Sequence, residues 1–173
     1  LVMGNFKAGQ KIKTSNANWK FSGNVVKKFD EHILKSVPLY IEGHDLICSI
    51  SDYFLQNKSL VYDLGCSTGT LINKLNKRHK EKKISFYGIE IEKDMVKKSK
   101  KLNLEKNVKF FNNNISKTKL KKNDLTICYY TIQFISPKIR QSIINKIFQG
   151  LNWGGAFLFF EKVRAPDARF QDI

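Results

Sequence analysis

The chain has 173 residues, 42% of them hydrophobic, and its 31 Lys and Arg residues outnumber 15 Asp and Glu residues to give a formal charge of +16. A chain of this length and composition predicts one globular domain with a sizeable core. The strongest apolar run, residues 156–160, is far shorter than the ~20 residues that span a bilayer, and the N-terminus lacks the apolar segment of a signal peptide. We therefore expect no membrane partner.

The cysteines and histidines do not follow the pattern of a disulfide framework or a metal site. The three cysteines are scattered without C-x-x-C spacing, and the three histidines lack metal-ligand spacing: Cys48, Cys66, Cys128, His32, His44 and His79. Scattered cysteines in odd number are typical of a reducing compartment, so we expect a cytoplasmic protein with no metal. Cys66 and Cys128 have no obvious base partner, which argues against a thiol nucleophile.

Lysine accounts for nearly all of the excess charge and is concentrated in residues 74–83, 93–101 and 117–122. A surface of this kind attracts polyanions, and RNA, including tRNA, is the obvious candidate partner. The plainer interpretation is that lysine only solubilises outer helical faces. Arginine is scarce, and specific RNA readers usually mix arginine and aromatic residues into the patch, so charge alone does not identify a partner.

The pattern divides the chain into a flexible basic arm over residues 1–18 and one domain over residues 19–173. Apolar residues recur at helical spacing before Pro38, and a second helix is predicted over residues 44–55. Strands and helices then alternate. The predicted strands are 60–63, 84–91, 108–111, 125–131 and 156–163, and the predicted helices between them are 70–78, 93–101 and 137–151. This alternation predicts an α/β fold with a parallel, doubly wound, Rossmann-like sheet behind an N-terminal helical lead-in.

A doubly wound nucleotide-binding sheet usually continues after its fifth strand, and here the last ten residues are too few for another helix and two strands. We therefore expect that the C-terminal strands are missing and that the chain is truncated. The alternative is a homo-oligomer that covers the apolar fifth strand, because an uncovered edge of this kind promotes aggregation.

The first candidate site is the loop Asp63-Leu64-Gly65-Cys66-Ser67-Thr68-Gly69, which follows the first strand. Ligands of open parallel sheets bind at the carboxyl ends of the strands. Here Gly65 and Gly69 permit a tight turn, and the next helix offers N–H groups. The loop lacks both the dinucleotide fingerprint and the lysine of a phosphate-binding loop. With Asp63 in front, it fits a ligand with a cationic amino-acid end; the alternative is a tight turn with no ligand.

Three further strand ends provide candidate ligand contacts. Glu90 closes the second strand, where a carboxylate accepts hydrogen bonds from ribose hydroxyls. Asn114 could accept from an adenine amino group while Ile115 packs against the ring; the alternative is a simple polar turn. Tyr129 and its neighbours line the pocket or serve as ordinary strand packing.

Several segments together resemble the carboxy-S-adenosylmethionine synthase family. They are Phe29-Asp30-Glu31-His32-Ile33, Ser36-Val37-Pro38-Leu39-Tyr40, the glycine loop, Gln133-Phe134 and Gly150-Leu151-Asn152-Trp153-Gly154-Gly155. The resemblance implies the class I methyltransferase fold, S-adenosylmethionine or its carboxylated or demethylated forms as cofactor, and a link to tRNA wobble-uridine modification. It also implies cofactor contacts from Tyr40, Gly65, Cys66, Ser67, Glu90, Ile91, Asn114, Ile115 and Tyr129.

Three positions depart from this family. It has Asp in place of Glu90, which preserves the carboxylate, Asp in place of Asn114, and Asn in place of Tyr129. The arginine that reads the additional carboxylate in that family lies in a C-terminal region absent from this sequence, and without it the carboxylated cofactor loses its ion pair. No residue is a persuasive general base, so the catalytic residues stay unassigned.

Two functions remain open at this point. The first is an S-adenosylmethionine-dependent transferase, acting by methyl transfer or by synthesis of the carboxylated cofactor. The second is a non-catalytic module, derived from such an enzyme, that binds the cofactor or RNA.

Overall fold

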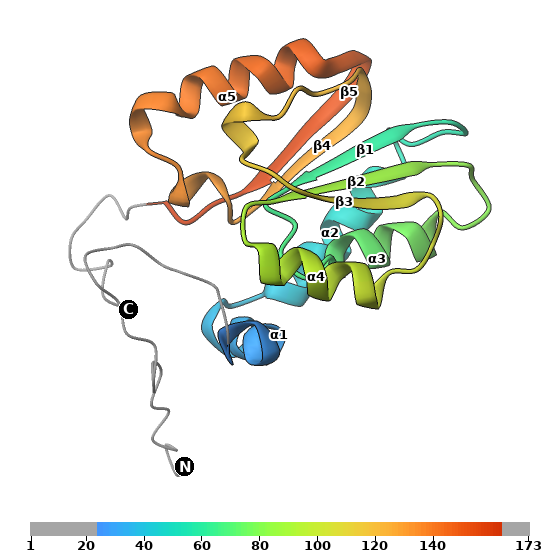
Figure 1. The fold of residues 1–173 in the computed structure, drawn as a ribbon. Coiled ribbons are helices and arrows are strands. Elements are labelled where there is room, and N and C mark those ends of the chain that lie inside the picture. The colour runs from blue at the N-terminus through green and yellow to red at the C-terminus, as the bar shows by residue number, and fades with distance from the viewer. Residues whose placement is uncertain (1–23, 164–173) are drawn as a thin grey trace, which may run out of the picture.

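The computed structural model describes residues 24–163, in which a five-stranded parallel sheet lies between two layers of helices (Figure 1). The predicted arm, residues 1–18, lies outside the described residues, as do residues 19–23 and 164–173 of the predicted domain. The strands are β1 (Leu60–Leu64), β2 (Ser85–Glu90), β3 (Val108–Asn112), β4 (Asn123–Tyr129) and β5 (Leu151–Phe160). Their order is β3-β2-β1-β4-β5 and every pair is parallel, which confirms the predicted doubly wound sheet.

Helices cover both faces of the sheet (Figure 1). On one face lies α5 (Pro137–Gly150); on the other lie α2 (Tyr40–Ser51), α3 (Thr70–Arg78) and α4 (Lys93–Leu102), with α1 (Asn24–Ser36) beside α2 and α4. Two short 3-10 helices, η1 (Ile115–Lys117) and η2 (Ile132–Phe134), follow β3 and β4. None of the helices within residues 24–163 is long and apolar enough to cross a membrane.

Alternating side chains of the strands build a separate core on each face. In β1, Val61 packs with the α2, α3 and α4 side, whereas Tyr62 and Leu64 pack with Ile143 and Ile147 of α5. Because both faces are covered, the strands are apolar almost throughout, as is typical of parallel sheets. An acidic residue in such a strand, such as Asp63, is therefore conspicuous.

The second helix begins earlier than the sequence predicts. We expected it to start at His44, but α2 starts at Tyr40, directly after Leu39, whose φ of 56° is left-handed. That conformation turns the chain within one residue after Pro38, so the new helix begins at once. Apolar periodicity missed the first turn because it contains Glu42 and Gly43. This early start places Tyr40 on the helix, where it faces the site.

The ends of β4 and β5 also differ from their predicted bounds. β4 stops at Tyr129 instead of Thr131 because Tyr130 has a φ of 53° and leaves the extended conformation. β5 starts at Leu151, which pairs with Asn123, and regular pairing then resumes where Ala156 meets Leu125. The predicted turn at Gly154-Gly155 is thus an irregularity within the strand, with Gly154 at a φ of 78°.

Candidate functional site

A cavity of about 620 Å³ opens at the carboxyl ends of the central strands. Ten of the eleven residues predicted to bind the cofactor line it: Tyr40, Asp63, Gly65, Cys66, Ser67, Glu90, Ile91, Asn114, Ile115 and Tyr129. Gly69 is the exception: it directly precedes α3 and is not part of the lining. Its φ is 79°, and a Cβ there would lie 2.7 Å from Phe110 Cζ, so Gly69 serves the turn and the packing of β3.

The glycine loop is tied to the end of β2 by its own backbone. The amide N–H groups of Gly65 and Cys66 donate to Ile89 O, at 2.7 and 3.2 Å, and that of Gly69 donates to Cys66 O at 2.8 Å. Gly65 has a φ of 84°, and a Cβ there would overlap the Thr131 side chain. These three N–H groups are used within the protein, so they hold the shape of the loop and are not available to a ligand. The N–H groups expected from the sequence are those at the start of α3.

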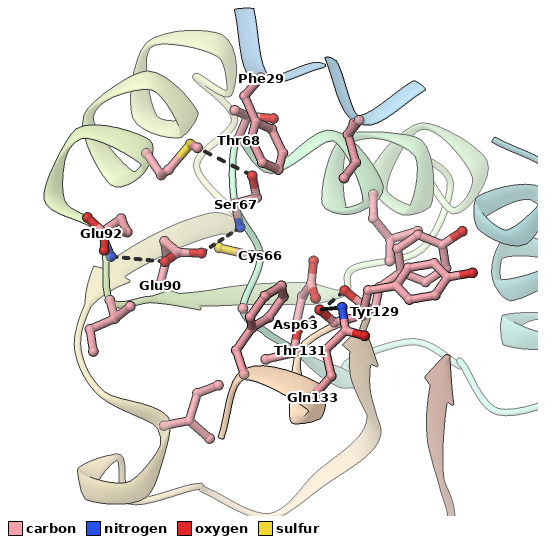
Figure 2. Close-up of a pocket in the computed structure, with 18 of the residues that line it drawn as sticks. Phe29, Asp63, Cys66, Ser67, Thr68, Glu90, Glu92, Tyr129, Thr131 and Gln133 are labelled. Atoms are coloured by element: carbon pink, nitrogen blue, oxygen red, sulfur yellow. Dashed lines mark hydrogen bonds between the residues drawn. The ribbon is translucent and has the colours of Figure 1, made fainter. Parts of the chain in front are cut away.

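Glu90 connects the glycine loop with the turn that leads into α4. Its two carboxylate oxygens accept from Ser67 N and Glu92 N, each at 2.9 Å (Figure 2). Glu90 is 9% exposed, and burial raises the pKa of this carboxyl group while the backbone hydrogen bonds oppose the rise. Each carboxylate oxygen can accept a second hydrogen bond. Glu90 is therefore fixed in place with acceptor capacity left for a ligand.

Asp63 is the one acidic residue buried at the end of β1, at 2% exposure. Its Oδ1 has no hydrogen-bond partner among the described residues. Burial, followed by the charge of Glu90, raises the pKa of Asp63 to about 7. A buried carboxylate without a partner is costly, and a cationic ligand group in the cavity would remove most of that cost.

Asn114 lies at the end of β3 but does not offer the group that we expected. Its Oδ1 accepts from both Ser116 N and Ser116 Oγ, at 2.8 Å each, and so caps η1. An amide oxygen has two acceptor positions, and both are occupied. The predicted acceptor for an adenine amino group is therefore engaged within the protein, and the amide nitrogen, a donor, is left for a ligand.

An aromatic wall from α2 and β4 closes the end of the cavity beyond Asp63. Tyr129 donates its hydroxyl to Tyr40 O at 2.7 Å, and the two rings meet edge to face at 5.1 Å. His44 packs 4.6 Å from each of these rings. A Cβ on Gly43 would overlap the Tyr129 hydroxyl, so this glycine makes room for the tyrosine. Tyr129 is thus both a lining residue and the link between β4 and α2.

The buried thiols of Cys66, which lines the cavity, and of Cys128, which does not, are unsuited to nucleophilic chemistry. Burial raises the pKa of both Cys66 and Cys128 well above its usual value, with the charge of Asp63 adding to the effect. A protonated thiol is a poor nucleophile. The described part of the chain also contains no group of three His, Cys, Asp or Glu residues that could hold a metal ion.

Part of the lining was not assigned any role from the sequence. It comes from α1, from the start of α4 and from η2 with the residue after it, and includes Phe29, His32, Ser36, Met95, Phe134 and Ile135. Figure 2 shows Phe29 above the glycine loop. Glu161 sets the position of η2, because its carboxylate accepts from the backbone N–H groups of Thr131, Ile132 and Gln133 at 2.6 to 3.0 Å. The sequence contains one signal for the role of Glu161, which is its position as an acidic residue directly after a very apolar strand.

Asp30 attaches α1 to the site. Its Oδ1 accepts from Thr68 Oγ1 in the glycine loop, and its Oδ2 pairs with Lys98 of α4, both at 2.6 Å. The same helix contributes Phe29 and Ile33 to the lining. Asp30 therefore joins the N-terminal helix to two walls of the cavity.

Comparison with known proteins matches residues 61–155, more than half of the chain, to the methyltransferase domain. A carboxy-S-adenosyl-L-methionine synthase from Campylobacter lari is 34% identical over 91% of this chain and 67% of its own length. A synthase of the same name from Staphylococcus epidermidis is 31% identical over 90% of this chain and 68% of its own. The chain thus spans about two thirds of the length of these relatives.

Among solved structures, DesVI of Streptomyces venezuelae has a similar fold, with a TM-score of 0.68 over 85% of this chain and 61% of its own. Its sequence is 14% identical, so this likeness concerns the fold alone. The expected methyltransferase architecture is confirmed by the family match and by this fold.

Replacing Asp30 with Asn should loosen α1 from the cavity. The variant loses the ion pair with Lys98. Because this pair is partly exposed, we expect the attachment of α1 to weaken by about 1 kcal/mol, which corresponds to roughly fivefold faster amide exchange in α1. Hydrogen exchange followed by mass spectrometry measures this. Asp94→Asn, which removes the Lys97 pair on α4, is the control and should leave α1 unchanged. Equal exchange in the wild type and Asp30→Asn would show that Asp30 does not hold the helix.

Proposed function

This chain belongs to the methyltransferase-domain family, and we propose that it is an S-adenosylmethionine-dependent transferase related to the carboxy-S-adenosylmethionine synthases. We propose that it binds its cofactor in the cavity at the carboxyl end of the sheet. The observation that carries the proposal is the Asp63 carboxylate, which is buried in the cavity wall and whose Oδ1 has no partner within residues 24–163. The ammonium group of the cofactor's methionine end supplies the missing partner.

The strand order matches the order of groups along the cofactor. β3, β2 and β1 are neighbours in the sheet, and with strands ~4.8 Å apart their ends span about 10 Å. We assign the adenine to Ile91, Asn114 and Ile115, the ribose hydroxyls to Glu90, and the methionine end to Asp63. The donor left on Asn114 suits a ring nitrogen of adenine rather than its amino group.

The charge of the cavity suits a cation. Asp63, Glu90 and Glu92 line it, and none of its described lining residues is Lys or Arg. The tyrosine rings of the aromatic wall add π faces that attract a sulfonium. The additional carboxylate of the carboxylated cofactor would meet no cation among these residues. We therefore assign plain S-adenosylmethionine as the ligand of the described cavity, with group transfer relying on proximity and orientation.

Purified protein should contain or bind S-adenosylmethionine, or its demethylated product, in preference to the carboxylated form. Mass spectrometry of the extracted ligand identifies the species, and calorimetry measures the affinity. Glu90→Gln should weaken binding ~10–100-fold, because a hydrogen bond to a charged group contributes about 1.5–3 kcal/mol. The exposed Glu105→Gln is the matched control. Recovery of the carboxylated cofactor would refute the preference, and absence of binding would refute the proposed function.

Cofactor affinity should depend on the ionisation of Asp63. The carboxyl group, with its pKa of about 7, must lose its proton to bind the ammonium, so affinity should fall about tenfold per pH unit below 7. The folded pKa lies above the unfolded value of 3.8, so the apo protein loses stability as pH rises from 4 to 7. Asp63→Asn should remove both dependences. Calorimetry and thermal unfolding from pH 5 to 8 measure them, and identical pH profiles for wild type and variant would contradict the assignment.

We also propose that the lysine-rich surface binds RNA. Exposed lysines of α4 and the following connection include Lys93, Lys97, Lys100, Lys101 and Lys106. Binding of tRNA should weaken linearly in log–log plots against salt, and the double variant Lys100→Gln/Lys101→Gln should reduce the slope by about 1.4–1.8. Lys138→Gln, on α5 across the sheet, is the control. Salt-independent binding, or none, would favour the plainer view that these lysines only solubilise the surface.

A further inference from the structure

His44 is buried at the cavity wall with an unused hydrogen-bonding group. The side chain is 1% exposed and lines the cavity, yet its Nδ1 has no partner among the described residues. Only two other buried side-chain atoms within residues 24–163 lack a partner, Asp63 Oδ1 and Asn103 Oδ1. Asp63 shares the cavity with His44, whereas Asn103 is not in its lining. Unpartnered buried polar groups are rare in proteins, so two of them on one cavity point to a ligand.

The methionine end of the cofactor carries a carboxylate beside its ammonium group, and this carboxylate needs donors. The described lining offers no Lys or Arg. The backbone N–H groups of Gly65, Cys66 and Gly69 donate to backbone carbonyls, and that of Ser67 donates to Glu90. Side-chain donors are also present in the lining, and two of them, Tyr40 and His44, lie on α2.

Tyr40 and His44 stand one turn apart on α2, with ring centroids 4.6 Å apart, and both line the cavity. Burial, followed by the charge of Asp63, raises the pKa of Tyr40, so the phenol stays protonated and can donate a hydrogen bond. Burial, with a smaller effect of Lys74, lowers the pKa of His44 to about 4, against the opposing effect of Asp45. The imidazole is therefore neutral at pH 7 and carries one N–H donor.

We propose that His44, with the Tyr40 hydroxyl beside it, binds the α-carboxylate of the cofactor's methionine end. This assignment rests on the proposed function and adds a specificity residue to it. In this assignment Asp63 of β1 binds the ammonium group and the two α2 side chains bind the carboxylate. The two charges of the amino-acid end are therefore bound by different elements of the fold. His44 in this role binds the cofactor and performs no chemical step.

The test compares S-adenosylmethionine with decarboxylated S-adenosylmethionine, which keeps the sulfonium and the ammonium but lacks the α-carboxylate. Calorimetry of the wild type should show ~10–100-fold tighter binding of S-adenosylmethionine, the range of a hydrogen bond to a charged group. His44→Phe keeps an aromatic ring against Tyr40 and Tyr129 but removes the donor. The His44→Phe variant should weaken only the binding of S-adenosylmethionine, and so reduce the ratio of the two affinities about fivefold or more. His44→Gln, with an amide donor, should restore part of the ratio.

The matched control is His79→Phe, which changes a buried histidine that bonds to Ser51 outside the cavity lining. It should leave the affinity ratio at the wild-type value even where it lowers stability. A wild-type protein with equal affinity for both ligands would overturn the assignment, as would a His44→Phe variant that weakens both equally or neither. Should His44→Phe not fold, His44→Leu, which also lacks a donor, takes its place, and an unchanged wild-type ratio in that variant counts against the assignment. Failure of the wild type to bind either ligand would instead overturn the proposed function.

Discussion

The cavity depends on one carboxylate that is held by backbone amides. Glu90 accepts from Ser67 N in the glycine loop and from Glu92 N before α4, so the carboxyl ends of β1 and β2 keep a fixed spacing. Gly65 and Cys66 strengthen the connection by donating to Ile89 O. Because these amides are satisfied within the protein, the loop needs no ligand in order to fold. Its glycines therefore serve shape first, and the recognition of charge falls on side chains.

Asp63 stands in contrast to Glu90. Both carboxylates are buried, but backbone N–H groups stabilise the charge of Glu90, whereas Asp63 Oδ1 has no such partner in the part of the chain that the structure describes, and the pKa of Asp63 rises to about 7. Burying the Asp63 carboxylate without a partner costs free energy in the apo protein. This cost is removed when a cation binds beside the carboxylate. Glu90 thus holds the shape of the site through backbone N–H groups and keeps acceptor capacity for a ligand, whereas Asp63 is the carboxylate that needs a cation. This difference between the two carboxylates follows from the sheet. β1 lies at the centre of the sheet, where a side chain loses the most contact with water.

The sequence was sufficient to predict the sheet, because apolar runs alternate with periodic helices and each run ends at a residue that suits a site. Asp63, Glu90 and Asn114 were found in that way. The start of α2 was not, because it depends on the left-handed conformation of Leu39, which no periodicity reveals. Asp30 and Glu161 were missed as well, since their partners lie 38 and about 30 residues away along the chain. The roles of single atoms, such as Asn114 Oδ1, depend on local hydrogen bonds that only coordinates define.

Two of the three departures from the family pattern, those at positions 114 and 129, act in the same direction. Where a carboxylate at position 114 would leave one oxygen for the ligand after capping η1, Asn114 leaves only a donor. Where asparagine at position 129 would offer an amide, Tyr129 offers a ring face, because its hydroxyl is bound to Tyr40 O and fitted against Gly43. Both changes remove acceptor groups that would contact the ligand. We propose that the acceptors Asp63 and Glu90 bind the amino-acid end and the ribose, so that the cofactor's positive charge contributes more to its recognition than its adenine.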